Sequence, residues 1–330
     1  MRPIRLELSA FGPYLEHTVI DFEKLNEIVS FENRFDVQKK MKSPGTIYEI
    51  LPKLNAYQAV IVSGIEATLR NGIVKACIDK DIDCYFIPHT GDVIIAGAKH
   101  LQSFSIPIMS ARRAVLRPEY AFAKRTLDAL LAALGLVIAS PVMLITAIAI
   151  KAYDNGPVIY RQVRLTKDGK PFEILKFRSM RVDAEKDGVA RLAADQDSRI
   201  TPVGRIIRTV HFDELPQLWN ILRGDMSIVG PRPERPEIAA QYEQEMPAFS
   251  LRLQVKAGLT GTAQVYGRYN TEPRDKLKMD LMYINNMSLG EDLKLIFATV
   301  KIMFMKERTA GVQIGQVTAA KAGVAEKKSA

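Results

Sequence analysis

The sequence has few cysteines and none of the common nucleotide-binding loops. Its 330 residues include two cysteines, Cys77 and Cys84, whose spacing matches neither a CxxC motif nor a disulfide framework. We therefore expect two structural thiols in a reducing compartment. Neither a GxxxxGKS/T loop nor a GxGxxG fingerprint occurs in the chain, so the sequence predicts no nucleotide site of either kind.

A secretion signal is also missing from the start of the chain. Residues 1–15 mix charges with apolar side chains and lack the apolar core of a signal peptide, so we expect the protein not to be exported. Overall, 47% of the residues are hydrophobic and 25% are charged, a globular balance with room for two domains. The net charge of +9 suits an anionic partner: nucleic acid, a phosphorylated substrate or acidic lipid headgroups.

One segment departs from the soluble pattern. No charged residue occurs from Ala129 to Ile150, and a helix of that length can cross a hydrocarbon core of about 30 Å. Proline removes a backbone hydrogen bond at Ser140-Pro141, in the middle of the run, and favours a bend there. Basic residues flank both ends, whereas a simple span places one flank in the cytoplasm. We therefore expect a re-entrant helix over residues 127–151.

Short patterns on either side of this run predict mixed α and β structure. Upstream, residues 58–63, 66–81 and 83–88 have the spacing of a strand, a helix and a second strand. Downstream, residues 158–165 and 171–177 predict a hairpin, because Asp-Gly is favoured in tight turns. Near the end of the chain, residues 292–305 predict a core helix or a helix lying in the membrane interface, and residues 307–330 predict a disordered tail.

The most informative stretch is FDELPQLWNILRGDMSIVGPRPE, which begins at Phe212. Asp is a favoured residue type at a helix N-cap and Gly at a helix end, so Asp213 and Gly224 predict the two ends of a helix. Asp213 and Glu214 would then lie at the positive end of a helix dipole, where a carboxylate stays ionised and phosphate can bind. Adjacent carboxylates can also hold Mg²⁺ against a diphosphate. A capping role alone is the commoner explanation for an arbitrary Asp-Glu pair.

Several motifs in a fixed order give the chain a specific resemblance. After the Ser140-Pro141 break come NGPVIYRQVRL, KFRSM, the stretch above, KAGLTGTAQVYG and MDLMYINNMSLGEDLKL. The chain resembles the bacterial sugar transferases, monotopic phosphoglycosyl transferases that start exopolysaccharide, capsule or O-antigen assembly on undecaprenyl phosphate. The resemblance covers residues 120–306, the expected catalytic domain.

The resemblance implies roles for particular residues. Asp213 matches the nucleophile, which attacks the sugar-bearing phosphate of a UDP-sugar, expels UMP and forms a covalent intermediate. Glu214 matches the second member of the dyad, which with Asp213 helps to bind Mg²⁺. Lys176 and Arg232 match basic residues that contact phosphate, and Asp280 matches a further acidic position. In the membrane helix, Ser140 and Pro141 match the re-entrant break.

The same resemblance implies an architecture and partners. The fold class is α/β: a membrane-associated α+β catalytic domain with a re-entrant helix, preceded by a partial Rossmann-like domain at residues 46–115. We expect it on the cytoplasmic face of the bacterial inner membrane, bound to membrane lipids, a UDP-sugar and undecaprenyl phosphate. UDP-glucose or UDP-galactose is favoured over N-acetylated donors, and a homodimer is left open. Residues 1–29 resemble the opening strands of an SbcC-type ATPase head and stay unassigned.

Two other functions are weighed against this one. A nucleic-acid-associated protein would suit the positive charge, but it leaves the apolar run unexplained and no DNA-binding motif is present. A catalytically inactive, membrane-anchored scaffold of polysaccharide synthesis is the remaining alternative. His211, in the Thr209-Val210-His211-Phe212 sequence that departs from many relatives, is assigned a packing or capping role.

Overall fold

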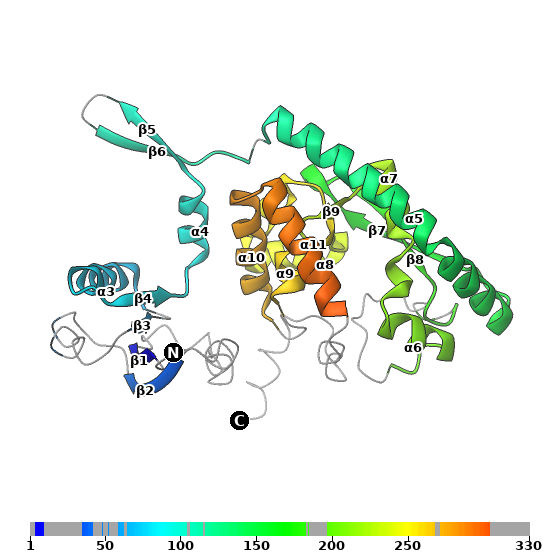
Figure 1. The fold of residues 1–330 in the computed structure, drawn as a ribbon, viewed down its shortest axis with the longest axis horizontal. Coiled ribbons are helices and arrows are strands. Elements are labelled where there is room, and N and C mark those ends of the chain that lie inside the picture. The colour runs from blue at the N-terminus through cyan, green and yellow to red at the C-terminus, as the bar shows by residue number, and fades with distance from the viewer. Residues whose placement is uncertain are drawn as a thin grey trace. The chain divides into compact units, whose positions relative to one another are not determined.

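The computed structural model describes residues 4–9, 35–41, 48, 52, 59–62, 65–103, 106–114, 116–182, 184, 197–267 and 271–303. The expected tail at residues 307–330 lies outside this part of the chain. Two compact units are present, Met1–His89 and Thr90–Ala330, and the structure is a mixed α and β fold (Figure 1).

The amino-terminal unit, Met1–His89, is built on a four-stranded sheet in the order β2-β1-β3-β4, whose neighbouring strands all run parallel. Its elements are β1 (Ile4–Ser9), β2 (Phe35–Met41), β3 (Ala59–Val62), α3 (Ala67–Asp79) and β4 (Asp83–Phe86). The predicted strand–helix–strand unit is confirmed as β3–α3–β4. β1 lies between β2 and β3, so the segment 1–29 contributes a central strand.

The core of this unit is formed by one face of β3 and one face of α3, because side chains alternate along a strand and recur about every 3.6 residues along a helix. Val60 and Val62 alternate along β3 onto one face, and Ile73 and Cys77 lie four residues apart on one face of α3. All four side chains are fully buried and pack in one cluster. Cys77 is thus a core residue with a free thiol, as is expected of a structural cysteine.

Among its described residues, the carboxy-terminal unit, Thr90–Ala330, has three pairs of strands. Antiparallel pairs join β5 (Lys99–Ser103) to β6 (Ile106–Ser110) and β7 (Ile159–Leu165) to β8 (Pro171–Phe177), while β9 (Ser227–Val229) and β10 (Gly258–Thr260) run parallel. The predicted β7–β8 hairpin is confirmed. Its turn, η3 (Lys167–Gly169), places Asp168 at φ 62° and Gly169 at φ 70°, the left-handed region that Asp and Gly tolerate best.

Helices pack against β7, β8, β9 and β10. The helices described in this unit are α4 (Thr90–Ala96), α5 (Pro118–Asp154), α6 (Pro202–Thr209), η4 (Phe212–Glu214), α7 (Gln217–Arg223), α8 (Pro236–Glu245), η5 (Pro247–Gln254), α9 (Thr262–Val265), α10 (Pro273–Asn285) and α11 (Leu289–Met303). The helix α4 belongs to this unit because Asn285 on α10 donates a hydrogen bond of 2.7 Å to the Val93 carbonyl, and Val93 is buried beside Leu281.

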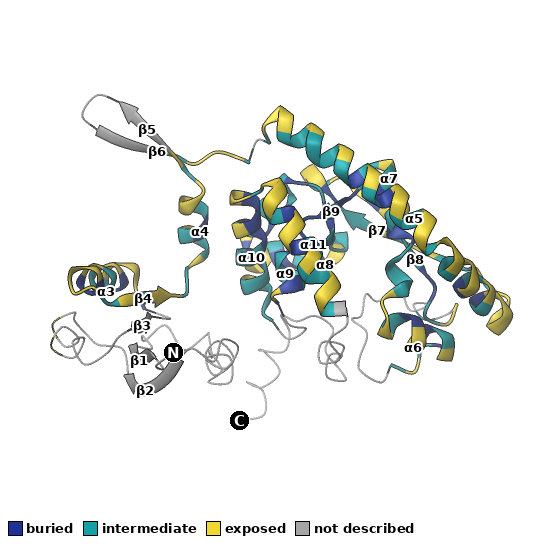
Figure 2. Cartoon of the chain, in the orientation of Figure 1, coloured by how far each residue is buried: buried dark blue, intermediate teal, exposed yellow. Residues whose placement is uncertain are grey.

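The long helix α5 is long and apolar enough to cross a membrane, and 11% of its most apolar window is buried within the protein. A core helix would be mostly buried, whereas much of α5 is exposed (Figure 2). The helix continues through Pro141, which has no N–H for the carbonyl of Val137. The hydroxyl of Ser140 donates to that carbonyl instead, at 2.8 Å. The re-entrant path stays a prediction.

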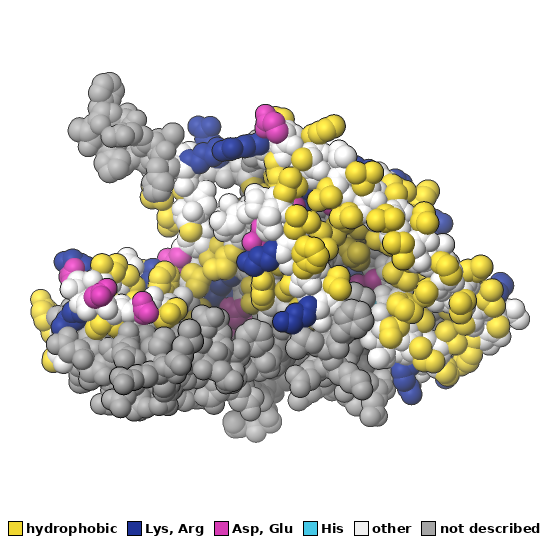
Figure 3. Space-filling view, viewed as in Figure 1, with side chains coloured by type: hydrophobic (Ala, Val, Ile, Leu, Met, Phe, Trp, Pro, Cys, Tyr) yellow, Lys and Arg dark blue, Asp and Glu magenta, His cyan; other side chains and the backbone are white. Residues whose placement is uncertain are grey.

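Apolar side chains are exposed along α5 and α11 (Figure 3). The large exposed ones on α11 are Leu289, Leu293, Phe297 and Val300. Those on α5 are Phe122, Leu130, Leu134, Val137, Ile138, Leu144, Ile145, Ile148 and Tyr153. On its other face α11 buries Leu295 completely. The helix therefore has a core face and an exposed apolar face. This arrangement is compatible with both roles predicted for residues 292–305, a core helix and a helix in the membrane interface.

Candidate active site

The predicted dyad lies in a tight turn rather than at a helix cap. His211 lies between α6 and the dyad with φ 58°. The next three residues, Phe212–Glu214, form the 3₁₀ turn η4. Pro216 stands at the N-cap of α7 with no side-chain cap. The expectation that Asp213 caps this helix is wrong, because α7 begins at Gln217 and its N-cap residue is Pro216. The predicted end at Gly224 is confirmed, with φ 96°.

Three segments distant in sequence meet at Glu214. Lys176 on β8 approaches Oε1 of Glu214 through its Nζ at 2.6 Å. Arg232, in the loop after β9, approaches the same oxygen through Nη2 at 3.0 Å. Glu214 and Lys176 are 18% and 19% exposed, while Arg232 is 47% exposed. The structure thus brings together three of the predicted site residues, Glu214, Lys176 and Arg232, and a fourth, Asp213, is adjacent to Glu214 in the same turn.

Burial and charge act in opposite directions on the two carboxylates. Burial would raise the pKa of Glu214, but Lys176 and Arg232 outweigh it and hold that pKa well below its ordinary value. For Asp213 burial dominates and raises the pKa, opposed by Lys176 and reinforced by the charge of Glu214. The pair therefore consists of one firmly ionised carboxylate and one more basic carboxylate, which is the better nucleophile of the two.

Asn220 fixes the relative position of the dyad turn and Lys176, and sequence reasoning missed it. Its side chain is fully buried on α7. Oδ1 accepts from the Leu175 N–H at 2.9 Å, and Nδ2 donates to the Glu173 carbonyl at 2.8 Å. Both partners lie on β8, so Asn220 joins the helix after the dyad to the strand that carries Lys176. These two partners lie more than forty residues away in sequence, and no local pattern reveals them.

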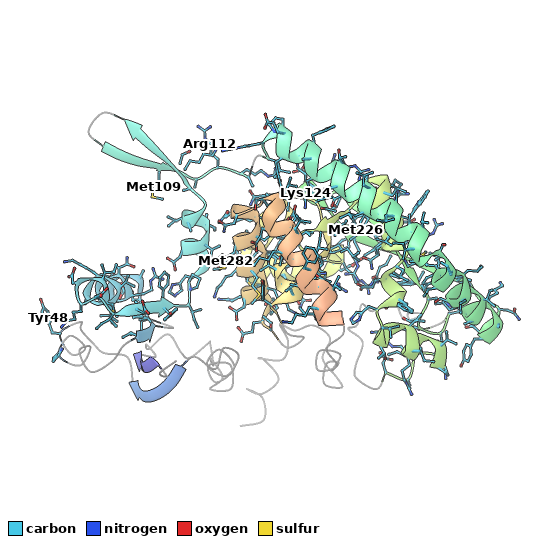
Figure 4. All side chains as sticks on the ribbon, viewed as in Figure 1. Tyr48, Met109, Arg112, Lys124, Met226 and Met282 are labelled. Carbon is cyan, nitrogen blue, oxygen red and sulfur yellow. The ribbon has the colours of Figure 1, made fainter. Side chains whose placement is uncertain are left out.

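Polar side chains on the first turns of α5 bind the same unit. Arg125 donates to the carbonyls of Ile221 and Leu222, both at 2.7 Å, and so caps the end of α7. Lys124 binds Asp292 of α11 at 2.8 Å, where α5 passes α10 and α11 (Figure 4). At the other end of α5, Asp154 contacts Arg178. Both ends of the apolar helix are therefore tied to the unit that holds the dyad.

The remaining predicted residues lie elsewhere. Asp280 on α10 is 2% exposed, and its carboxylate binds Arg252 at 2.7 Å rather than a residue of the dyad. Burial raises the pKa of Asp280, and Arg252 opposes that shift. Ser140 and Pro141 are exposed on α5, and His211 is exposed beside the dyad turn.

The dyad fits the donor set of a magnesium ion. Both protein contacts to Glu214 reach Oε1, and within the described part of the chain no protein hydrogen bond reaches its Oε2 or the carboxylate of Asp213. Mg²⁺ takes one or two carboxylates together with phosphate oxygens. No group of three acidic, histidine or cysteine ligands occurs among the described residues, so any ion would rely on the dyad and its substrate.

A carboxylate pair faced by a lysine and an arginine, beside an exposed apolar helix, defines a site suited to a phosphorylated substrate at a membrane. Residues 119–306 match the bacterial sugar transferase family. The chain therefore belongs to that family, as the sequence predicted.

Individual relatives extend the comparison. The chain is 43% identical over 187 residues to a UDP-N-acetylgalactosamine-undecaprenyl-phosphate N-acetylgalactosaminephosphotransferase of Aeromonas hydrophila, which covers 56% of this chain and 44% of that protein. It is 38% identical over 261 residues to the UDP-glucose:undecaprenyl-phosphate glucose-1-phosphate transferase of Escherichia coli K12, covering 78% and 54%. An enzyme of the same name from Caulobacter vibrioides is 44% identical over 182 residues, covering 54% and 68%. The chain spans about half the length of the first two.

Proposed function

We propose that this protein is an enzyme that transfers a sugar-1-phosphate from a UDP-sugar to undecaprenyl phosphate, with release of UMP. The observation that carries the proposal is the meeting of Lys176 and Arg232 on Glu214, with the raised pKa of Asp213 in the same turn. Two cations suit a diphosphate, and a basic, ionised carboxylate suits attack on phosphorus.

The reaction proceeds in two displacements. An oxygen of Asp213 attacks the sugar-bearing phosphorus of the donor, and the bond from that phosphorus to the UMP oxygen breaks. UMP leaves with the electron pair, and a phosphosugar ester of Asp213 remains. A phosphate oxygen of undecaprenyl phosphate then attacks the same phosphorus, forming the diphosphate product and returning Asp213 as a carboxylate.

The chain's own residues arrange these steps. Lys176 and Arg232 hold Glu214 ionised and offer donors to phosphate oxygens. We propose that Glu214 and Asp213 also hold Mg²⁺, which when bound would neutralise charge on the diphosphate. Asp213 is the residue that exchanges bonds with phosphorus.

We further propose that α5 is re-entrant and holds the site at the cytoplasmic face of the inner membrane. Basic residues flank both ends of the helix, and both ends bind the unit that carries the dyad. A helix whose two ends return to one domain keeps a soluble donor and a lipid acceptor at one surface. Residues 120–306 would form the catalytic domain. The parallel β3–α3–β4 unit supports a partial Rossmann-like domain within residues 46–115, and the part of that range from Thr90 onward belongs to the carboxy-terminal unit.

UMP release tests this function. Purified protein in nanodiscs is given Mg²⁺, undecaprenyl phosphate and a panel of UDP-sugars, beside the Asp213→Asn variant. The matched control is Asp168→Asn, the same substitution in the β7–β8 turn, where asparagine tolerates the left-handed backbone. We expect release to depend on Asp213 and to be unchanged in the control. No release from folded, inserted protein with any donor would instead favour the inactive scaffold.

A further inference from the structure

The loop that carries Arg232 is held by its carbonyl groups. It contains Pro231 and Pro233, which have no N–H to donate, yet all four consecutive carbonyls from Pro231 to Glu234 accept a hydrogen bond. The donors, in order, are the Gly258 N–H at 2.9 Å, Arg252 Nη2 at 2.8 Å, Arg164 Nη1 at 3.2 Å and the Leu165 N–H at 3.0 Å. Three separate elements, β7, η5 and β10, therefore set the path of this loop.

Arg252 supplies the contact at Arg232 itself. Its side chain is 7% exposed, and its Nε and Nη2 bind Oδ2 of Asp280 at 3.0 and 2.7 Å. The guanidinium also lies over the ring of Phe249, 4.9 Å from its centroid. Carboxylate, ring and carbonyl together leave the fork of Arg252 one orientation.

The side chain of Arg232 is far less constrained. It is 47% exposed and forms an ion pair with Glu214. The position of its guanidinium therefore depends on the position of the Arg232 backbone. A displacement of about 1 Å in a group that aligns a substrate can cost on the order of 100-fold in rate.

We propose that Arg252 is a positioning residue for Arg232, and that Asp280 serves the reaction by orienting Arg252 rather than by touching the substrate. The inference rests on the proposed function above. In this proposal the buried ion pair of Arg252 on η5 with Asp280 on α10 holds Arg232 in its position beside the dyad.

A double-mutant cycle tests the coupling. The variants Arg252→Gln, Arg232→Ala and the pair are compared by kcat/KM for the UDP-sugar in the UMP-release assay. We expect Arg252→Gln to lower kcat/KM by about 10- to 100-fold when Arg232 is present. In the Arg232→Ala background the same change should cost less than about threefold, because coupled residues are not additive. Equal losses in both backgrounds would show that Arg252 acts on the whole fold and would overturn the proposal.

Two further variants separate positioning from folding. Arg252→Lys keeps a charge opposite Asp280 but loses the fork, so we expect KM for the donor to rise while the thermal midpoint stays near that of the parent. Arg178→Lys removes the same fork from an arginine that is equally buried, at 7% exposed, and that pairs with the more exposed Asp154 instead of contacting the loop. It should leave donor KM unchanged.

Failure of the function itself is read separately. Titration calorimetry of UDP with Asp213→Asn protein measures the Arg232 contact without turnover, and the same cycle is run on that Kd. A protein that binds UDP with a coupled cycle but releases no UMP contradicts the proposed function and retains the positioning role. UMP release with an uncoupled cycle supports the proposed function and contradicts the positioning role of Arg252.

Discussion

At the scale of single residues, we expect the charges around Glu214 to set the pH below which the proposed reaction slows. Lys176 and Arg232 both contact its Oε1, and Lys176 lowers the pKa of Asp213 as well as that of Glu214. In the proposed mechanism the carboxylate of Asp213 must be unprotonated to attack phosphorus, so we expect activity to fall as pH drops through the pKa of Asp213 in the folded protein.

Removing Lys176 should therefore move the acid limb of the pH–rate profile upward. In Lys176→Gln the pKa of Asp213, already raised by burial, loses the cation that opposes that rise. We expect kcat/KM for UMP release to begin falling at a higher pH than in the parent, besides being lower throughout.

The control for this profile is Lys170→Gln, the same change at an exposed position in the β7–β8 connection, which should leave the limb in place. An acid limb that stays put or moves downward in Lys176→Gln would remove Lys176 from the electrostatics of Asp213.

Asn220 provides a residue-scale prediction on stability. Asn220→Ala leaves the Leu175 N–H and the Glu173 carbonyl without their partner, and each buried, unpaired group costs about 1–3 kcal/mol. We expect a loss of about 2–4 kcal/mol in unfolding free energy, measured by denaturant titration in detergent. Asn286→Ala removes an exposed amide that bonds the Met282 carbonyl. Its effect should stay within about 0.5 kcal/mol, and equal losses in the two variants would contradict the bridging role.

What the sequence reveals of the site depends on how far apart the partners lie. Asp213 and Glu214 are adjacent, and the motifs around Lys176 and Arg232 allowed both to be predicted. The contact of Arg252 with Asp280 spans 28 residues, and Asn220 reaches back 45 residues to Leu175. Neither pairing leaves a local pattern, because it arises only when the elements pack.

At the scale of elements, local chemistry predicted most of the structure near the site. The Asp168-Gly169 turn and the two alternating strands are local features, and the hairpin was predicted correctly. Gly224 ends α7 in the left-handed conformation that glycine favours. The predicted start of α7 was wrong because the segment Phe212–Glu214, which the cap pattern assigned to the beginning of the helix, forms a separate 3₁₀ turn.

Helix α5 allows a prediction at the Ser140-Pro141 step. Ser140 supplies to the Val137 carbonyl the hydrogen bond that Pro141 cannot donate. Ser140→Ala should therefore destabilise the protein by about 0.5–1.5 kcal/mol, seen as a lower thermal midpoint in nanodiscs. In Ser140→Ala/Pro141→Ala the new N–H at position 141 can bond that carbonyl, so stability should return. A double variant with a lower thermal midpoint than Ser140→Ala would show that the hydroxyl has another role.

At the scale of the whole molecule, the exposed apolar faces account for features that the catalytic chemistry leaves unexplained. On α5 such residues run from Phe122 to Ile148. On α11, Leu293, Phe297 and Val300 recur at helical spacing opposite the buried Leu295. Charged or polar groups tie both helices to the catalytic unit, so their apolar faces remain available to lipid.

The exposed face of α11 should contribute to acceptor binding at the membrane. Phe297 is 71% exposed, and burying such a side chain in lipid is worth about 1.5–3 kcal/mol. With α5 still inserted, Phe297→Glu should keep the protein in the membrane but raise KM for undecaprenyl phosphate about tenfold, leaving donor KM unchanged. Phe297→Leu preserves the apolar surface and should behave as the parent. If both acceptor and donor KM stay at parental values in Phe297→Glu, α11 lies in water, and α5 alone provides the contact with lipid.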